Sequence, residues 1–189
     1  MGNRAVITTR ENWDNNGVGV YLHWNGGRDS VEAFLKYCEL KGYRKPTDDS
    51  YGWAYLCGVI TNYFGDGLSC GIDVLHNLDY NNGDNGIYII DGWEIVDRIY
   101  FNGIEQDGHA LVDMVRLIDE SMPVEMQLTD EEWDKFFASV VKPFTDDKEK
   151  MEDFVRLSRG EFVKVYPYIT DEEYDATVMD VLAKLNRDV

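Results

Sequence analysis

The stretch IYIIDGWEIVDRIY, residues 87–100, carries the clearest fold signal in the chain. Two segments rich in β-branched and aromatic side chains, residues 87–90 and 93–100, flank the dipeptide Asp91-Gly92. Asp-Gly supplies the positive φ angles that a two-residue turn between antiparallel strands requires. The stretch therefore predicts a β-hairpin, and with it an antiparallel sheet.

Two more strands are predicted near the N-terminus. Residues 4–9 are rich in β-branched side chains, and residues 18–24 begin with apolar side chains at every second position. The sequence Asn15-Asn16-Gly17 between them has the composition of a turn. Residues 68–75 fit a strand and a helix equally well, and this segment is left open.

Three helices are expected in the first two thirds of the chain. The first begins at Asp29, an N-cap that is followed three residues later by Glu32. The second spans residues 50–64, with Trp53 on its main apolar face. It is apolar on nearly every side, which predicts a central position in the fold. The third covers residues 107–121.

The C-terminal part is expected to be mostly helical. The sequence TDEE occurs at residues 129–132 and 170–173, and each copy matches a capping box at the start of a helix. The predicted fold class is α+β: a small antiparallel sheet packed with helices, followed by a helical C-terminal part. Residues 1–122 form the predicted α+β domain and residues 123–189 the helical subdomain, either as separate parts or around one continuous core.

The composition predicts a folded, acidic protein. The 189 residues are 44% apolar and 13% aromatic, which is too rich for disorder, and the net charge is −18. A nucleic-acid binder would carry a basic footprint instead. The three cysteines form no C-x-x-C pattern and are expected as free thiols in a reducing cytoplasm. No apolar run has the length of a membrane helix.

The negative charge is concentrated in the middle of the chain. Residues 46–134 hold nineteen Asp and Glu but two Lys and Arg, a net of −17, whereas residues 1–45 carry +2 and residues 135–189 carry −3. Like charges on a compact body repel one another, so folding does not favour this distribution. Two explanations stay open: a surface that keeps the chain dispersed in water, and a surface that meets a basic macromolecule.

Metal-ligating and nucleophilic motifs are weak throughout the sequence. The histidines, His23, His76 and His109, have no zinc-binding spacing, and the cysteines lack the neighbours of a catalytic thiol. Residues 79–86 fail the calcium-loop pattern. We therefore expect no metal, no cofactor and no catalytic residue, and a binding protein more readily than an enzyme.

A glycine turn at HWNGGRDS, residues 23–30, is the alternative site. It lies between a predicted strand and a predicted helix N-terminus, where backbone N–H groups and Arg28 could receive a phosphate or a carboxylate. It matches neither the dinucleotide-binding fingerprint nor the P-loop. The alternative hypothesis is a small-ligand or nucleotide-binding protein, enzymatic or not, that uses four side chains: His23, Trp24, Asn25 and Arg28.

The segment YLHWNGG, residues 21–27, resembles small acidic proteins of phages and mobile elements of Gram-positive bacteria. These proteins carry an aromatic-x-His-Trp-Asp/Asn-Gly segment between a strand and a helix. The likeness covers residues 1–100, and Asn25 stands where an acid is common. It implies an anti-defence context of the anti-restriction or anti-CRISPR type, in which an acidic protein occupies a nucleic-acid site on a host protein.

These observations predict an inhibitor that docks on a basic nucleic-acid-binding surface of a host defence protein. Its carboxylates would replace phosphates, as in a DNA mimic. We expect contact with neither nucleic acid nor membrane, and the oligomeric state stays open. The expected partner contacts lie on the hairpin and its flanking turns: Asp84, Asp91, Glu94, Asp97, Glu105 and Asp107.

Overall fold

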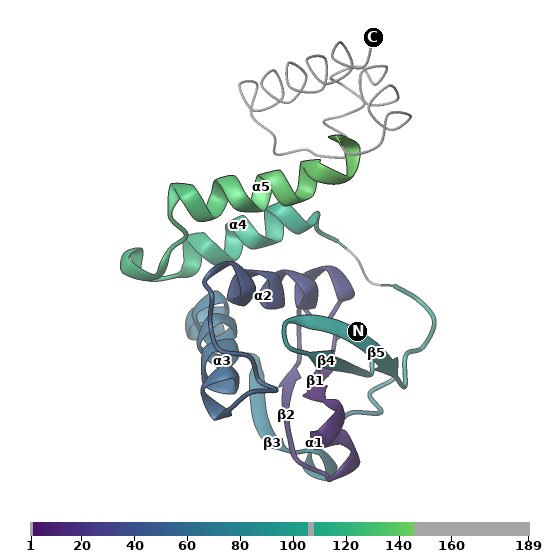
Figure 1. The fold of residues 1–189 in the computed structure, drawn as a ribbon. Helices are drawn as coiled ribbons and strands as arrows, with labels where there is room; N and C mark the ends of the chain where they lie inside the picture. Colours follow the sequence, from purple (N-terminus) through teal and green to yellow (C-terminus); the bar gives the residue numbers. More distant parts are fainter. Residues whose placement is uncertain (1, 106–107, 146–189) are drawn as a thin grey trace. The chain divides into compact units, whose positions relative to one another are not determined.

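The computed structural model describes residues 2–105 and 108–145 (Figure 1). The chain divides into two compact units, Met1–Gln127 and Leu128–Val189, which are described separately. The predicted division into residues 1–122 and 123–189 stays a prediction, because most of its second part lies outside the described residues. Within the described ranges, no helix has the length and apolar character needed to span a lipid bilayer.

In its described part, the first unit combines five strands with four α-helices and three 3-10 turns. The strands are β1 (Ala5–Thr9), β2 (Val18–Leu22), β3 (Cys70–Val74), β4 (Ile87–Asp91) and β5 (Glu94–Ile99). The α-helices are α1 (Arg10–Asp14), α2 (Arg28–Leu40), α3 (Ser50–Phe64) and α4 (Leu111–Ser121). The 3-10 turns are η1 (Gly65–Gly67), η2 (Leu75–Asn77) and η3 (Val124–Met126). The predicted α+β class is confirmed.

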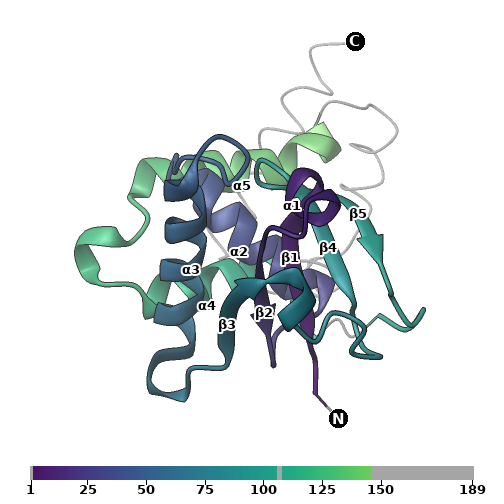
Figure 2. The same ribbon diagram turned by 90° about the horizontal axis from the view of Figure 1, so that it is seen from below.

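The five strands form one sheet in the order β3-β2-β1-β4-β5 (Figure 2). The sheet is mixed and not wholly antiparallel as expected: β1 and β4 run parallel, and the other neighbours antiparallel. A parallel pair needs a long connection, and here the chain forms three α-helices (α1, α2 and α3) and two strands (β2 and β3) on its way from β1 to β4. β3 is an edge strand, on which Ile72 is 56% and Val74 37% exposed.

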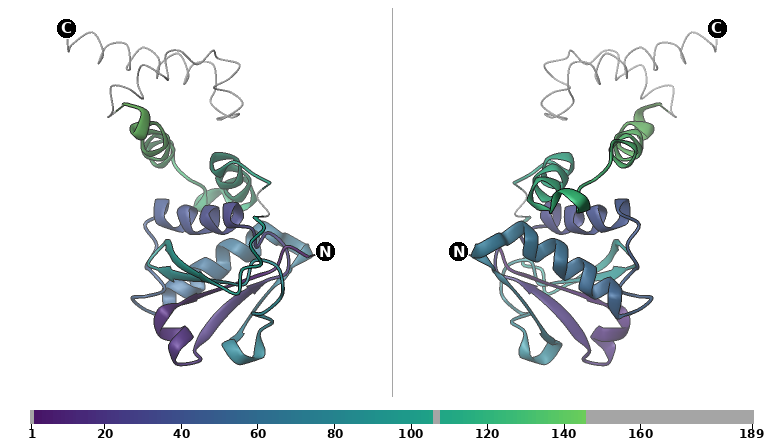
Figure 3. Two further views of the ribbon diagram at one scale, coloured as in Figure 1. Left: turned by 90° about the vertical axis from the view of Figure 1, so that its right-hand side faces the viewer. Right: turned by 90° about the vertical axis from the view of Figure 1, so that its left-hand side faces the viewer.

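The sheet is covered on both faces. Figure 3 shows α2 on one side of the strands and α1 on the other. Ile7, Val20 and Tyr88 are neighbours in the register on the α2 side, and all three are fully buried. Val6 and Ile87 face the opposite side, in a second apolar cluster. Partly buried side chains pack against that cluster: Trp13, Tyr21, Leu78, Tyr80 and Ile99.

The predicted hairpin is present, but its turn lies one residue further along the chain. Asp91 pairs with Glu94 at the end of the ladder, so the two loop residues are Gly92 and Trp93. Gly92 has a φ of +61°, as the first position of a II′ turn requires. Trp93 is buried, and its indole N–H donates to the Tyr43 carbonyl at 3.2 Å. This contact ties the turn to the loop that follows α2.

Two helix predictions need correction. α2 begins at Arg28 with Gly27 as its N-cap, so Asp29 lies in the first turn and is not the cap. α3 has the predicted bounds but is not central, because Tyr51 is 61% and Tyr55 36% exposed. Tyrosine combines an apolar ring with a polar end, so a helix rich in tyrosine can satisfy an apolar pattern at the surface.

The described part of the second unit is dominated by α5 (Asp130–Thr145). Its predicted capping box is confirmed. The Thr129 N–H donates to the Glu132 carboxylate at 2.8 Å, and the Glu132 N–H donates to Thr129 Oγ1 at 3.3 Å. The second predicted box, at residues 170–173, lies outside the described residues.

We expect Gly86→Ala to destabilise the fold far more than Gly83→Ala. Both glycines have a positive φ, +68° and +73°, so each alanine variant is strained by about 1–2 kcal/mol. At Gly86 the added Cβ would also lie 2.1 Å from the Ile99 carbonyl oxygen, whereas the space at Gly83 is open. Urea unfolding should therefore show a further loss of about 2 kcal/mol for Gly86→Ala. Equal losses in the two variants would contradict the close approach of the two backbones.

Candidate binding cleft

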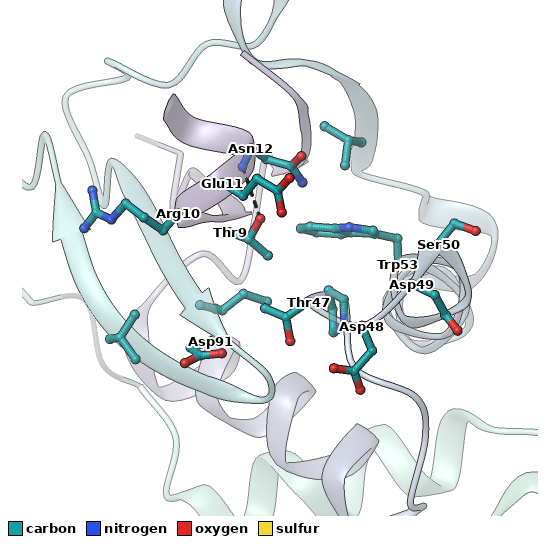
Figure 4. A pocket seen from close by; sticks show the side chains of 14 residues that line it. Thr9, Arg10, Glu11, Asn12, Thr47, Asp48, Asp49, Ser50, Trp53 and Asp91 are labelled. Atoms are coloured by element: carbon teal, nitrogen blue, oxygen red, sulfur yellow. Dashed lines mark hydrogen bonds between the residues drawn. The ribbon is translucent and has the colours of Figure 1, made fainter. Parts of the chain in front are cut away.

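The parallel pairing of β1 and β4 brings their carboxyl ends to the same edge of the sheet. Thr9 pairs with Ile90 there, one residue before Asp91. Ligands of open sheets commonly bind beyond the carboxyl ends of parallel strands. A cleft of about 700 Å³ opens at this edge (Figure 4), and its walls include residues 9–12, residues 46–50 and Trp53.

Helix starts position both walls of the cleft. β1 runs directly into α1, and Thr9 caps this helix by accepting a hydrogen bond from the Asn12 N–H at 3.3 Å. On the opposite wall, Asp49 caps α3 by accepting from the Tyr51 N–H at 2.9 Å. Capping side chains satisfy backbone donors that the helix itself leaves unpaired. The two caps therefore hold the rims of the cleft in place.

Carboxylates border the cleft from three segments. Glu11 comes from α1, Asp48 from the loop before α3, and Asp91 from the end of β4 (Figure 4). All three residues are exposed. In the part of the chain that the structure describes, none of these carboxylates forms an ion pair or a side-chain hydrogen bond. The cleft is therefore open to a cationic group.

Two arginines near the cleft are already paired. Arg10 forms an ion pair with Asp97, and this hydrogen bond is the main reason why the pKa of Asp97 lies below its ordinary value. Arg44 pairs with Asp49 at 2.9 Å. Desolvation works to raise the pKa of Asp49, but the hydrogen bonds from Arg44 and the Tyr51 N–H outweigh it and hold the pKa below its ordinary value. Neither arginine neutralises the three free carboxylates.

An indole forms an apolar wall of the cleft. Trp53 is half-buried, and Figure 4 shows its ring reaching toward Thr9 and Asn12. The Trp53 N–H has no hydrogen-bond acceptor among the described residues, whereas the N–H of Trp93 donates to Tyr43. Indole N–H groups usually find a partner when they are buried. The ring and its N–H are therefore available to a ligand.

Three of the expected partner contacts are exposed on the hairpin: Asp91, Glu94 and Asp97. Asp91 and Glu94 lie directly opposite each other in the ladder. Like charges in this position destabilise a hairpin. Asp91 also lines the cleft, so the charged turn and the cleft form one continuous surface.

Two other expected contacts are placed less favourably. Glu105 is exposed, but it accepts a hydrogen bond from Arg98 at 2.6 Å. The Arg98 guanidinium also lies over the rings of Tyr88 and Phe101, at 4.5 and 3.6 Å from their centroids. Glu105 thus belongs to a structural network. Asp107 lies outside the described residues.

The expectation that Asp84 is an exposed contact is wrong. Asp84 is 5% exposed, and its carboxylate accepts a hydrogen bond from Arg4 Nε at 2.6 Å. The Asp84 N–H donates to Asn82 Oδ1 at 2.9 Å, and Arg4 donates to the Asn82 carbonyl at 2.5 Å. Residues 79–86 have the composition of a solvated turn, but here they fold onto the start of β1, where Arg4 neutralises the acid.

The four side chains of the alternative site do not converge. His23 and Trp24 are exposed, and their ring centroids lie 5.2 Å apart. The Asn25 amide points toward α3. Arg28 donates to Glu32 at 2.6 Å, one turn further along α2. His23 and Trp24 thus contact each other, whereas Asn25 and Arg28 each bond residues outside the four.

The N-terminus of α2 is also occupied by an acid. Asp29 accepts hydrogen bonds from the backbone N–H groups of Gly108 and His109, each at 2.8 Å. A carboxylate in the first turn of a helix takes the favourable position of an anion and repels a second one. The geometry therefore does not favour a phosphate at this turn.

The described residues do not assemble a metal site, since no three His, Cys, Asp or Glu side chains among them are placed to hold an ion. Burial raises the pKa of the Cys57 thiol to about 11. Burial also raises the pKa of Cys38 and of Cys70 above the ordinary value. Thiols with a raised pKa are poor nucleophiles at neutral pH.

Asp84→Asn and Asp91→Asn provide a matched test of a buried and an exposed acid. Asp84→Asn should lower the free energy of unfolding by about 2–3 kcal/mol, because it breaks a partly buried ion pair with Arg4. Asp91→Asn should change it by less than about 0.5 kcal/mol or raise it slightly, since it removes the like-charge opposition to Glu94. Urea unfolding of both variants measures the difference, and a reversed order would contradict these assignments.

Comparisons of the chain with protein-family models, with curated proteins and with solved structures found no match. The residues of this chain itself therefore have to carry any functional conclusion. They offer an acidic cleft at the carboxyl ends of β1 and β4, with an indole in its wall and a charged hairpin turn beside it.

Proposed function

We propose that this protein is an acidic inhibitor that docks on a basic nucleic-acid-binding surface of a host defence protein. The docking surface consists of the β4–β5 turn and the adjoining cleft. One observation carries the proposal: Glu11, Asp48 and Asp91 stand exposed and unpaired in the described chain at one edge of a rigid sheet. Glu94 extends the same negative surface across the hairpin turn.

The charge of the hairpin turn supports a binding role. Asp91 and Glu94 oppose each other across two strands, which folding alone does not favour. Residue choices that cost stability without a structural benefit, such as this pair of like charges, tend to occur at functional sites. A basic surface bound against this turn would attract both carboxylates and offset their mutual repulsion.

The overall field supports a basic macromolecule as the partner. The central residues 46–134 carry a net charge of −17, and a field of this sign speeds encounter with a positively charged surface. Carboxylates on a rigid edge can take the place of phosphates in a protein groove that normally holds nucleic acid. The resemblance of residues 21–27 to proteins of mobile elements supports the anti-defence version of this proposal.

The double variant Asp91→Asn/Glu94→Gln should weaken partner binding at least about tenfold, because it removes two charges from the docking surface. Its matched control is Asp66→Asn/Asp73→Asn, which makes the same change in net charge at exposed positions in η1 and on β3, the edge strand furthest from β5 in the strand order. The tagged full chain is used to capture proteins from a bacterial lysate, and the affinity of each captured protein is then measured with purified components.

We expect the captured protein to carry a nucleic-acid site, to lose its nucleic acid when this chain binds, and to bind more weakly as salt rises from about 50 to 500 mM. The control variant should bind like the wild type. An affinity that does not fall as salt rises, or that both double variants lower equally, would contradict docking through the hairpin turn.

A further inference from the structure

The residues that line the cleft suit one particular kind of ligand. The Trp53 ring offers an aromatic face, and its N–H is unpaired among the described residues. Figure 4 shows Glu11 beside this ring, whereas Asp48 and Asp91 lie across the cleft from it. A cation held over an aromatic ring gains electrostatic attraction from the ring, and nearby carboxylates add to it. The ligand with the best chemical fit is therefore a cation that also has a flat or apolar part.

The cations of the protein itself do not fill this role. Figure 4 shows Arg10 pointing away from Trp53, and Arg10 is bound to Asp97. Arg44 is bound to Asp49. Lys45 lies along Gly92 at the hairpin turn, but it forms no ion pair in the described chain. The aromatic face is thus left to a cation from outside.

The size of the cleft favours a side chain over a small free ion. Its volume of about 700 Å³ exceeds what a metal ion needs, and the acids do not form a metal-ligating group in the described residues. Arginine suits such a site better than lysine, because its planar guanidinium stacks on aromatic rings, bonds a carboxylate through two parallel N–H groups and is more weakly hydrated.

We infer that the cleft receives an arginine side chain of the basic partner, stacked on Trp53 and paired with Glu11. This inference rests on the proposed function and names the anchor of the partner. Arginine and aromatic residues commonly dominate the binding energy of an interface. The arginine held in the cleft fixes the position of the partner, and the hairpin acids contact the basic surface around it.

The test is an NMR titration of the full-length, ¹⁵N-labelled protein with N-acetyl-arginine amide. N-acetyl-citrulline amide serves as the probe of the same shape without charge, and N-acetyl-lysine amide as the charged probe without the planar group. The Trp53 indole N–H signal is assigned with Trp53→Phe. We expect a saturable shift of this signal with arginine, at least about fivefold weaker binding of lysine, and no shift with citrulline.

Two variants and one control locate the site. Glu11→Gln, followed at the Trp53 indole N–H, and Trp53→Leu, followed at the backbone N–H signals of residues 9–12, should each weaken arginine binding at least about fivefold. Asp66→Asn should leave it unchanged. The spectrum of each variant shows whether the fold is kept, and a misfolded Trp53→Leu is replaced by Trp53→Met, which also removes the aromatic face. The absence of a saturable shift at about 100 mM arginine amide, or an equal response to citrulline, would overturn the inference.

The same variants separate this inference from the proposed function. Partner binding that is lost in Asp91→Asn/Glu94→Gln but retained in Trp53→Leu would overturn the arginine anchor and leave the docking proposal standing. Arginine binding at Trp53, without any basic protein partner, would overturn the docking proposal and leave the arginine site standing.

Discussion

The parallel pairing of β1 with β4 is the constraint on which the rest of the structure depends. β1 is buried along its whole length in the middle of the sheet, so its register determines which side chains enter each face of the core. Arg4 and Asp84 hold one end of this pair together through a short hydrogen bond. At the other end, Thr9 and Asp91 come to the same edge and open the cleft between them. The register of this one strand pair therefore places both the core side chains and the residues of the candidate cleft.

Three arginines of the first unit are paired with acids, while three carboxylates around the cleft are not. Arg4 binds Asp84, Arg10 binds Asp97, and Arg98 is held between two rings while it binds Glu105. Each arginine thus neutralises an acid that helps to hold the fold. Glu11, Asp48 and Asp91 around the cleft have no such partner in the described chain. The excess negative charge of the sequence therefore appears on the surface around the cleft.

Local patterns predicted the elements well, and contacts between distant segments explain most of the errors. The hairpin and the bounds of α3 follow from turn chemistry and from periodicity, which nearby residues determine. Asp84 was misplaced because its partner, Arg4, lies 80 residues away in the sequence. Trp53 was assigned to the core because an apolar spacing is the same for a buried position and for the wall of a cleft. The parallel pairing of β1 with β4 could not be predicted, because no single segment of the sequence carries a signal for it.

The open edge of β3 has a consequence for the protein in solution. Ile72 and Val74 are exposed on this strand, which has no second neighbouring strand among the described residues, and Asp73 lies between them. Such edges invite strands of other molecules, and charge is a common protection against this. Near pH 4.4 the net charge vanishes and the mutual repulsion of the molecules disappears with it. Mild acid therefore turns a well-dispersed protein into one that is prone to edge-to-edge aggregation.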